Sequence, residues 1–145
     1  MSEASFTGFA HPALPTVEEI RAWALDPASV APEGRHWDLT LATDDLVDTW
    51  LELAGDATCP KRSFALHVFY IYSGDAVRTK FRVHSRKRVD KLLEKAKGTR
   101  DQYVGLWAAN TKALIRRPDL SDYDEWCNGG MVRRPRRLSP GPTRR

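Results

Sequence analysis

Residues 59–84 read CPKRSFALHVFYIYSGDAVRTKFRVH, and the class of fold depends on how this aromatic stretch is interpreted. At 100° per residue, most of its apolar side chains fall within one half-circle and most of its polar ones fall on the other, with Val68, Ile71 and Lys80 as exceptions. Pro60 suits the first position of a helix, where its missing N–H costs nothing. The spacing therefore predicts one long, largely buried helix.

The same residues allow a second interpretation. Residues 64–72 are rich in aromatic and β-branched side chains, Ser73-Gly74-Asp75 has the composition of a turn, and residues 76–84 alternate apolar and basic side chains. These features are typical of a β-hairpin. A hairpin over 64–84 would make the protein α+β, so both interpretations stay open, with the helix favoured.

Start and stop signals for helices surround this segment. Residues that can cap a helix by accepting a hydrogen bond from its first turn are Thr16, Thr43, Ser85 and Thr99. Residues that end helices are Pro27, Gly55, Gly98 and Pro118. Residues 36–41 alternate apolar and polar side chains and are expected to be a short strand or an extended segment. We expect an all-α protein, a small orthogonal or antiparallel bundle of five to six helices.

Charge divides the chain into an acidic and a basic part. Residues 1–59 carry eleven acidic and two basic side chains, a net charge of −9, whereas residues 60–145 carry 21 basic and eight acidic ones, a net charge of +13. Residues 131–145 alone hold six arginines, three prolines and no acid, and without them the rest has a net charge of −2. We expect one helical domain over 1–130 and a disordered Arg/Pro-rich tail over 131–145.

Composition also limits the class of protein. No apolar run reaches the roughly 18 residues that a membrane span needs, and residues 1–15 lack the pattern of a secretory signal. Two cysteines make no disulfide framework, which indicates a reducing, cytoplasmic setting. The four histidines have no metal-ligand spacing, and no phosphate-binding glycine motif occurs. We therefore expect no metal, no cofactor and no membrane partner.

Candidate reactive side chains are few. His67 lies in an apolar run, and Asp75 and Arg78 are three residues apart, so on a helix they can form an ion pair. A pocket near these three residues is the basis for an enzyme, the least favoured function. Cys59 would lie at a helix N-terminus, where the helix dipole lowers a thiol pKa, but no histidine is adjacent to it or to Cys127. We assign no catalytic residue.

The favoured function is binding of another protein without catalysis. Its candidate contact residues are Asp75, Arg78, Tyr123 and Trp126. The alternative is association with nucleic acid through a basic helix face and the arginine-rich tail, since cations neutralise phosphates. Its candidate residues are Lys87, Arg88, Lys91, Lys95, Arg133, Arg134, Arg136 and Arg137.

Overall fold

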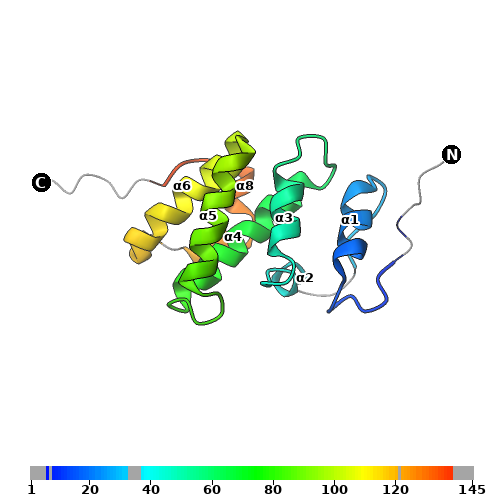
Figure 1. The fold of residues 1–145 in the computed structure, drawn as a ribbon, viewed down its shortest axis with the longest axis horizontal. Helices are drawn as coiled ribbons and strands as arrows, with labels where there is room; N and C mark the ends of the chain where they lie inside the picture. Colours follow the sequence, from blue (N-terminus) through cyan, green and yellow to red (C-terminus); the bar gives the residue numbers. More distant parts are fainter. Residues whose placement is uncertain (1–5, 7, 33–36, 121, 139–145) are drawn as a thin grey trace, which may run out of the picture.

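The computed structural model describes residues 6, 8–32, 37–120 and 122–138 (Figure 1). These residues form eight α-helices and one short 3₁₀ helix, η1, and contain no β-strand. The all-α prediction is confirmed. The helices are α1 (Val17–Leu25), α2 (Trp37–Thr40), α3 (Val47–Ala54), α4 (Arg62–Arg78), α5 (Arg86–Thr99), α6 (Gln102–Arg116), η1 (Pro118–Leu120), α7 (Tyr123–Cys127) and α8 (Gly130–Arg133).

The central aromatic segment is one helix, α4, so the hairpin interpretation is wrong. α4 ends at Arg78, three residues before the apolar pattern does, because Lys80 and Phe81 adopt positive φ angles of 56° and 64°. The N–H of Phe81 reaches back to the carbonyl of Ala76 at 2.7 Å, which satisfies one of the free carbonyls at the end of the helix.

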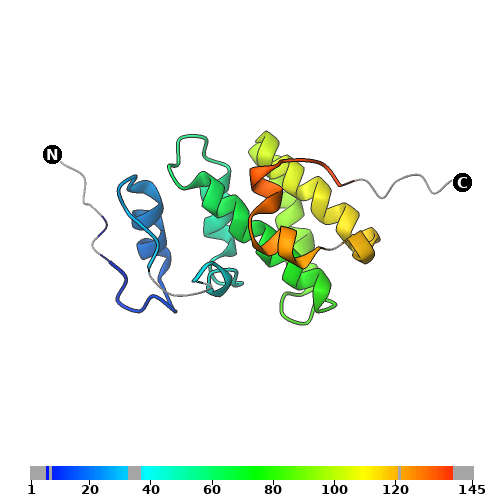
Figure 2. The same ribbon diagram turned by 180° about the vertical axis from the view of Figure 1, so that it is seen from behind.

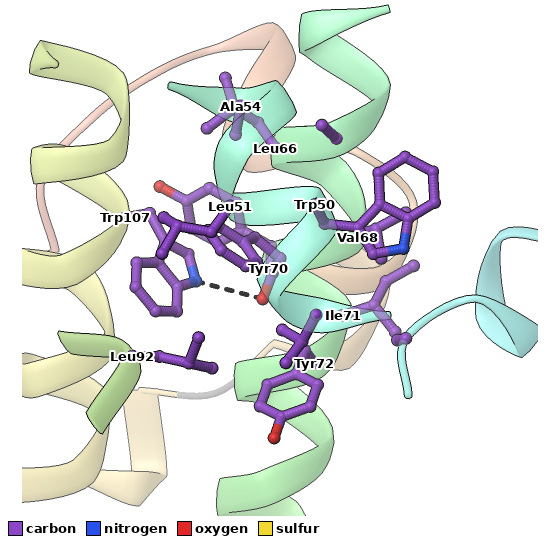
Figure 3. Close-up of a cluster of buried hydrophobic side chains, with 14 of the residues drawn as sticks. Trp50, Leu51, Ala54, Leu66, Val68, Tyr70, Ile71, Tyr72, Leu92 and Trp107 are labelled. Atoms are coloured by element: carbon purple, nitrogen blue, oxygen red, sulfur yellow. Dashed lines mark hydrogen bonds between the residues drawn. The ribbon is translucent and has the colours of Figure 1, made fainter. Parts of the chain in front are cut away.

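α4 is buried because other helices pack around it. In Figure 3, Trp50 of α3 lies on one side of α4 and Trp107 of α6 on the other. The Trp107 indole N–H lies within hydrogen-bonding distance of the Phe69 carbonyl, at 3.1 Å, and of the Ser73 hydroxyl, at 3.2 Å. Val68 and Ile71, which break the amphipathic pattern, are fully buried for this reason.

The remaining helices are ordered along the long axis of the molecule. α1 lies at one end, α5 and α6 lie at the other, and α4 crosses between them (Figures 1 and 2). α7 and α8 pack against α4 on the face seen in Figure 2. Within the described residues, no helix is both long and apolar enough to cross a membrane.

Several local expectations differ from the structure. α3 begins at Val47, so the Thr43 hydroxyl accepts from the Leu46 amide ahead of the helix rather than capping it, and α5 runs through Gly98 to Thr99. Within residues 36–41, of which 36 lies outside the described residues, the chain is helical at α2, where the Thr40 hydroxyl donates to the Trp37 carbonyl at 2.6 Å. α6 is capped by Asp101 rather than Thr99, and the Asp101 carboxylate accepts from the amides of Tyr103 and Val104, both at 2.9 Å. By contrast, the capping box at Thr16 and the cap at Ser85 are present.

The packed chain continues past residue 130, beyond the boundary expected for the tail. Met131 of α8 is 1% exposed and Leu138 is 8% exposed. The buried side chain of Asn110 holds this segment, because its amide N–H donates to the Arg136 carbonyl at 2.9 Å and its oxygen accepts from the Leu138 amide at 2.5 Å. Residues 131–138 therefore close the core, and residues 139–145 lie outside the described residues.

Candidate functional site

Helix α5 has one buried apolar face and one exposed face that is mainly basic. The hydroxyl of Ser85 starts the helix by accepting from the Arg88 amide at 3.2 Å. The face that packs on the bundle consists of Val89, Leu92, Leu93 and Ala96. Since these four residues recur at helical spacing, the lysines and arginines between them are turned toward solvent.

One edge of α5 borders a groove against α3, the α3/α5 groove, with a volume of about 340 Å³. Its lining includes two buried apolar side chains, Val47 of α3 and Leu92 of α5. The full lining consists of Val47, Asp48, Tyr72, Ser85, Lys87, Arg88, Lys91, Leu92 and Lys95. Four of these nine side chains are cationic and one is anionic, so the groove favours an anion.

The cations of this groove are only partly neutralised. Lys95 lies 2.9 Å from Asp48, and both side chains are about half exposed, so the pair is screened by salt. Arg88 lies 3.5 Å from Asp44. Lys87 and Lys91 are exposed and form no ion pair with any described residue. These two lysines are therefore free to meet a negatively charged ligand.

A hydrogen-bonded network fixes the wall of the groove below Arg88. The Asp44 carboxylate accepts from the Tyr72 hydroxyl at 2.6 Å and lies 2.9 Å from Nδ1 of His84. The rings of Tyr72 and His84 stack at 3.7 Å between centroids. Burial, followed by the hydrogen bond to Asp44, raises the pKa of Tyr72 far above its ordinary value, so this hydroxyl stays a donor.

The other edge of α5 borders a second groove, the α5/α6 groove, with a volume of about 480 Å³. Small side chains of α5 and α6 form much of its lining, which lets a ligand approach the helices closely. Its lining consists of Ala96, Lys97, Gly105, Ala108, Ala109, Lys112, Ala113, Arg116, Arg137 and Leu138. None of these side chains is acidic, and four are basic.

Both grooves thus belong to one basic region with α5 at its centre. We call their eight basic side chains the α5 surface, which consists of Lys87, Arg88, Lys91, Lys95, Lys97, Lys112, Arg116 and Arg137. The four predicted residues of the helix face are brought together here. Of the four predicted tail arginines, only Arg137 lines either groove.

The other three tail arginines have different surroundings. Arg136 forms a two-fold contact with Glu125, at 2.6 and 2.7 Å. Arg133 donates to the Asn128 carbonyl at 2.5 Å. Arg134 is exposed just after α8. The arginines therefore do not act as one cluster, because the chain carrying them is packed against α6 and α7.

The residues predicted to bind a partner form a second cluster, the Arg78–Tyr123 cluster, which consists of Asp75, Arg78 and Tyr123. Arg78 donates to Asp75 at 3.1 Å, and its guanidinium lies 4.7 Å from the centre of the Tyr123 ring. The hydrogen bond to Asp75 raises the pKa of Arg78. Trp126 is different, since it is 1% exposed and packs against Gly74 inside the core. Its side chain is not part of the surface.

Of the three residues of the enzyme interpretation, Asp75 and Arg78 pair with each other, and His67 is not part of that pair. His67 pairs through Nε2 with Asp38 of α2, at 2.7 Å, rather than with Asp75. Its Nδ1 is buried without a hydrogen-bond partner among the described residues, and a Cβ added at Gly129 would lie 3.5 Å from it. The four cavities described for this protein have linings without His67, Asp75 or Arg78.

Both cysteines are buried and unoxidised. Burial raises the pKa of Cys59, which precedes the first residue of α4 by three positions, so desolvation outweighs the helix dipole and the nearby Lys61. Burial also raises the pKa of Cys127 to about 11. No group of three or more metal-ligating side chains occurs within the described residues.

The α5/α6 groove is the part of the site that was not predicted from the sequence. Its signal is the spacing of Gly105, Ala108, Ala109, Lys112, Ala113 and Arg116 on one face of α6. Small residues at this spacing are ordinarily core positions, so the pattern alone does not separate a groove from a helix contact. No family model matches the chain, and no significant match to it is found among curated proteins or solved structures.

Proposed function

We propose that this protein binds nucleic acid through the α5 surface. The observation that carries the proposal is the pair of basic grooves on the two edges of one exposed helix. Cations that neutralise phosphates release bound counterions, and this release drives binding without regard to sequence. The basic side chains come from a folded helical face rather than from the extreme end of the chain.

The shape of the surface favours a duplex as the ligand. α5 has 14 residues and is therefore about 21 Å long, and an α-helix is about 10–12 Å wide with its side chains. The major groove of DNA is about 12 Å wide and admits such a helix. Cations on both edges of α5 would then meet the phosphates of both strands.

The lack of exposed aromatic rings in the two grooves is a second reason to favour a duplex. Single-strand binders stack bases on exposed aromatic rings. The aromatic side chain that lines the α3/α5 groove, Tyr72, is fully buried and hydrogen-bonded to Asp44, and no aromatic side chain lines the α5/α6 groove. Contacts with the phosphate backbone are what this surface offers.

The test is fluorescence anisotropy of a labelled DNA duplex titrated with the full chain at several salt concentrations. Binding should weaken steeply between about 50 and 200 mM salt. Lys87→Gln with Lys91→Gln removes two unpaired cations and should lower the slope of log K against log salt by roughly 1.8. If the labelled duplex shows no binding at about 50 mM salt, the proposal is wrong.

A matched control removes the same two charges elsewhere. Arg21→Gln with Arg78→Gln alters α1 and the end of α4, and neither residue lines a basic groove. This variant should keep the slope of the unaltered protein. Equal losses in both variants would mean that net charge, rather than the α5 surface, governs binding.

A second candidate function is binding of another protein through the Arg78–Tyr123 cluster. Tyr123 is 40% exposed, and arginine and tyrosine are enriched at the energetic centres of protein interfaces. Arg78→Gln with Tyr123→Ala should then abolish capture of a partner from lysate at moderate salt, while Lys87→Gln with Lys91→Gln leaves it intact. Loss of capture in the lysine variant alone would place the contact on the α5 surface instead.

A further inference from the structure

We infer that the open cavity between α4, α6 and α8 binds a small amphipathic acid, an aromatic or branched apolar group that carries one carboxylate. The cavity has a volume of about 360 Å³, within the usual range of small-molecule sites. It shares no lining residue with either basic groove, so this inference does not depend on the nucleic-acid proposal. Its lining comes from three helices and from the segment that follows α8.

Five of the ten side chains that line this cavity are apolar, and two more are tyrosines. α4 contributes Leu66, α6 contributes Leu106, and the short helix α8 adds two more apolar side chains. The apolar lining consists of Leu66, Leu106, Met131, Val132 and Pro135. These side chains favour an apolar ligand, because binding removes its apolar surface from water.

Tyr103 lines the cavity, and the guanidinium of Arg62 lies over its ring. Tyr103 is 38% exposed, and the Arg62 guanidinium lies 5.0 Å from the centre of its ring. Arg62 is itself held by an ion pair with Asp101 and by the Ala54 carbonyl. The charge of Arg62 is therefore already neutralised, and its part is to hold the Tyr103 ring in place for stacking with a ligand.

Arg133 is the cation in the lining that can pair with the carboxylate of the ligand. The hydrogen bond formed by its guanidinium runs from Nη1 to the Asn128 carbonyl at 2.5 Å, and its side chain forms no ion pair with any described residue. No acidic side chain lines the cavity. The lining also contains Ser63, an exposed residue in the first turn of α4, a turn that holds no acid and favours negative charge. A carboxylate can therefore pair with Arg133 while its apolar group fills the cavity.

Two related fluorescent probes separate the apolar and anionic parts of this site. 1-Anilinonaphthalene-8-sulfonate carries an anion, and N-phenyl-1-naphthylamine is the same apolar framework without it. Both should bind the full-length folded protein at one site and compete with each other. 3-Phenylpropionate should displace the neutral probe, and 3-phenylpropanamide, which lacks the charge, should do so roughly tenfold less well.

Variants then identify the residues. Arg133→Gln should weaken the sulfonate probe by roughly tenfold and leave the neutral probe within about twofold. Arg134→Gln is the matched control, since it removes the neighbouring charge outside the cavity, and it should change neither probe. Leu106→Glu should weaken both probes by more than about tenfold, because it places a carboxylate in the apolar wall.

The outcome also separates this inference from the nucleic-acid proposal. Lys87→Gln with Lys91→Gln should leave both probes unaffected. The inference is overturned if Arg133→Gln changes the two probes equally, if Arg134→Gln has the same effect as Arg133→Gln, or if the two probes do not compete. Far-UV circular dichroism of each variant checks that the helices are retained.

Discussion

At the scale of single residues, burial decides the chemistry of the two cysteines. Cys59 has two basic neighbours in sequence, Lys61 and Arg62, which alone would stabilise its thiolate. Its side chain is instead enclosed beside α1, where the thiol lies 3.8 Å from the Ala24 carbonyl. Cys127 is enclosed between α4 and its own helix. Loss of hydration therefore raises both pKa values.

This predicts slow alkylation in the folded state. With the pKa of Cys127 at about 11 and that of an unfolded cysteine at about 8.5, iodoacetamide at pH 8 should modify the folded protein roughly a hundredfold more slowly than the urea-unfolded chain. Mass spectrometry of timed samples measures both rates. Equal rates would show that Cys127 is accessible and ionised.

The same shift predicts how stability depends on pH. Between about pH 8.5 and 11 the folded state keeps the proton of Cys127 while the unfolded state releases it. The free energy of unfolding should therefore fall as the pH rises through this window. Replacing Cys127 by Ala should remove that part of the slope in urea titrations, whatever it costs in packing at pH 7.

Residue pairs differ in how far the sequence reveals them. Asp75 and Arg78 pair as expected, because a spacing of three on a helix brings side chains together wherever the helix lies. Asp38 and His67 are 29 positions apart, and their contact depends on how α2 packs against α4. A pair of this kind follows only from the tertiary arrangement.

At the scale of elements, α4 shows why periodicity predicts a helix better than its limits. The apolar pattern continues to Phe81, but the chain turns after Arg78 through two residues with positive φ. α2 was harder to predict, because four residues give too little periodicity to separate a helical turn from a short strand. In both cases the tertiary packing of the apolar side chains decides the outcome.

Two glycines in helices have opposite predicted responses to alanine. A Cβ added at Gly74 of α4 would lie 3.6 Å from Trp126, an ordinary contact, so Gly74→Ala should stabilise the protein by about 0.5–1 kcal/mol through helix propensity. A Cβ at Gly130 would lie 3.1 Å from the Glu125 carbonyl oxygen, so Gly130→Ala should cost about 1–2 kcal/mol. Urea unfolding measures both, and equal signs would contradict the packing described.

At the scale of the whole molecule, only some of the charges in the acidic part of the chain pair with charges in the basic part. Asp44 and Asp48 meet Arg88 and Lys95 where α5 packs near α3, so part of the charge asymmetry is used inside the fold. At the far edge of α5, Lys97 pairs with Glu94 of the same helix at 3.5 Å, but the lining of the α5/α6 groove holds four basic side chains and no acidic one. The sequence gives the sum of charges, and the packing decides where the excess lies.

The closure of the core by residues 131–138 predicts a large effect of deletion. A chain that ends at Gly130 lacks Met131 and Leu138 and leaves the buried side-chain oxygen of Asn110 without its partner, while the bond from its NH2 group to Tyr70 remains, and this should cost at least about 4 kcal/mol. Thermal unfolding followed by near-UV circular dichroism measures the loss. Arg134→Gln with Arg137→Gln, which keeps the apolar contacts, should unfold within a few degrees of the unaltered protein.

The hydrogen bonds that join Asn110 to Arg136 and Leu138 also supply a reporter of motion. The Leu138 amide donates to a side chain that is itself fully buried, so its hydrogen can exchange with deuterium only when residues 136–138 lift from α6. If that segment detaches alone, the Leu138 amide will exchange faster than the interior of α4, and if the molecule opens as a unit, the two will exchange together.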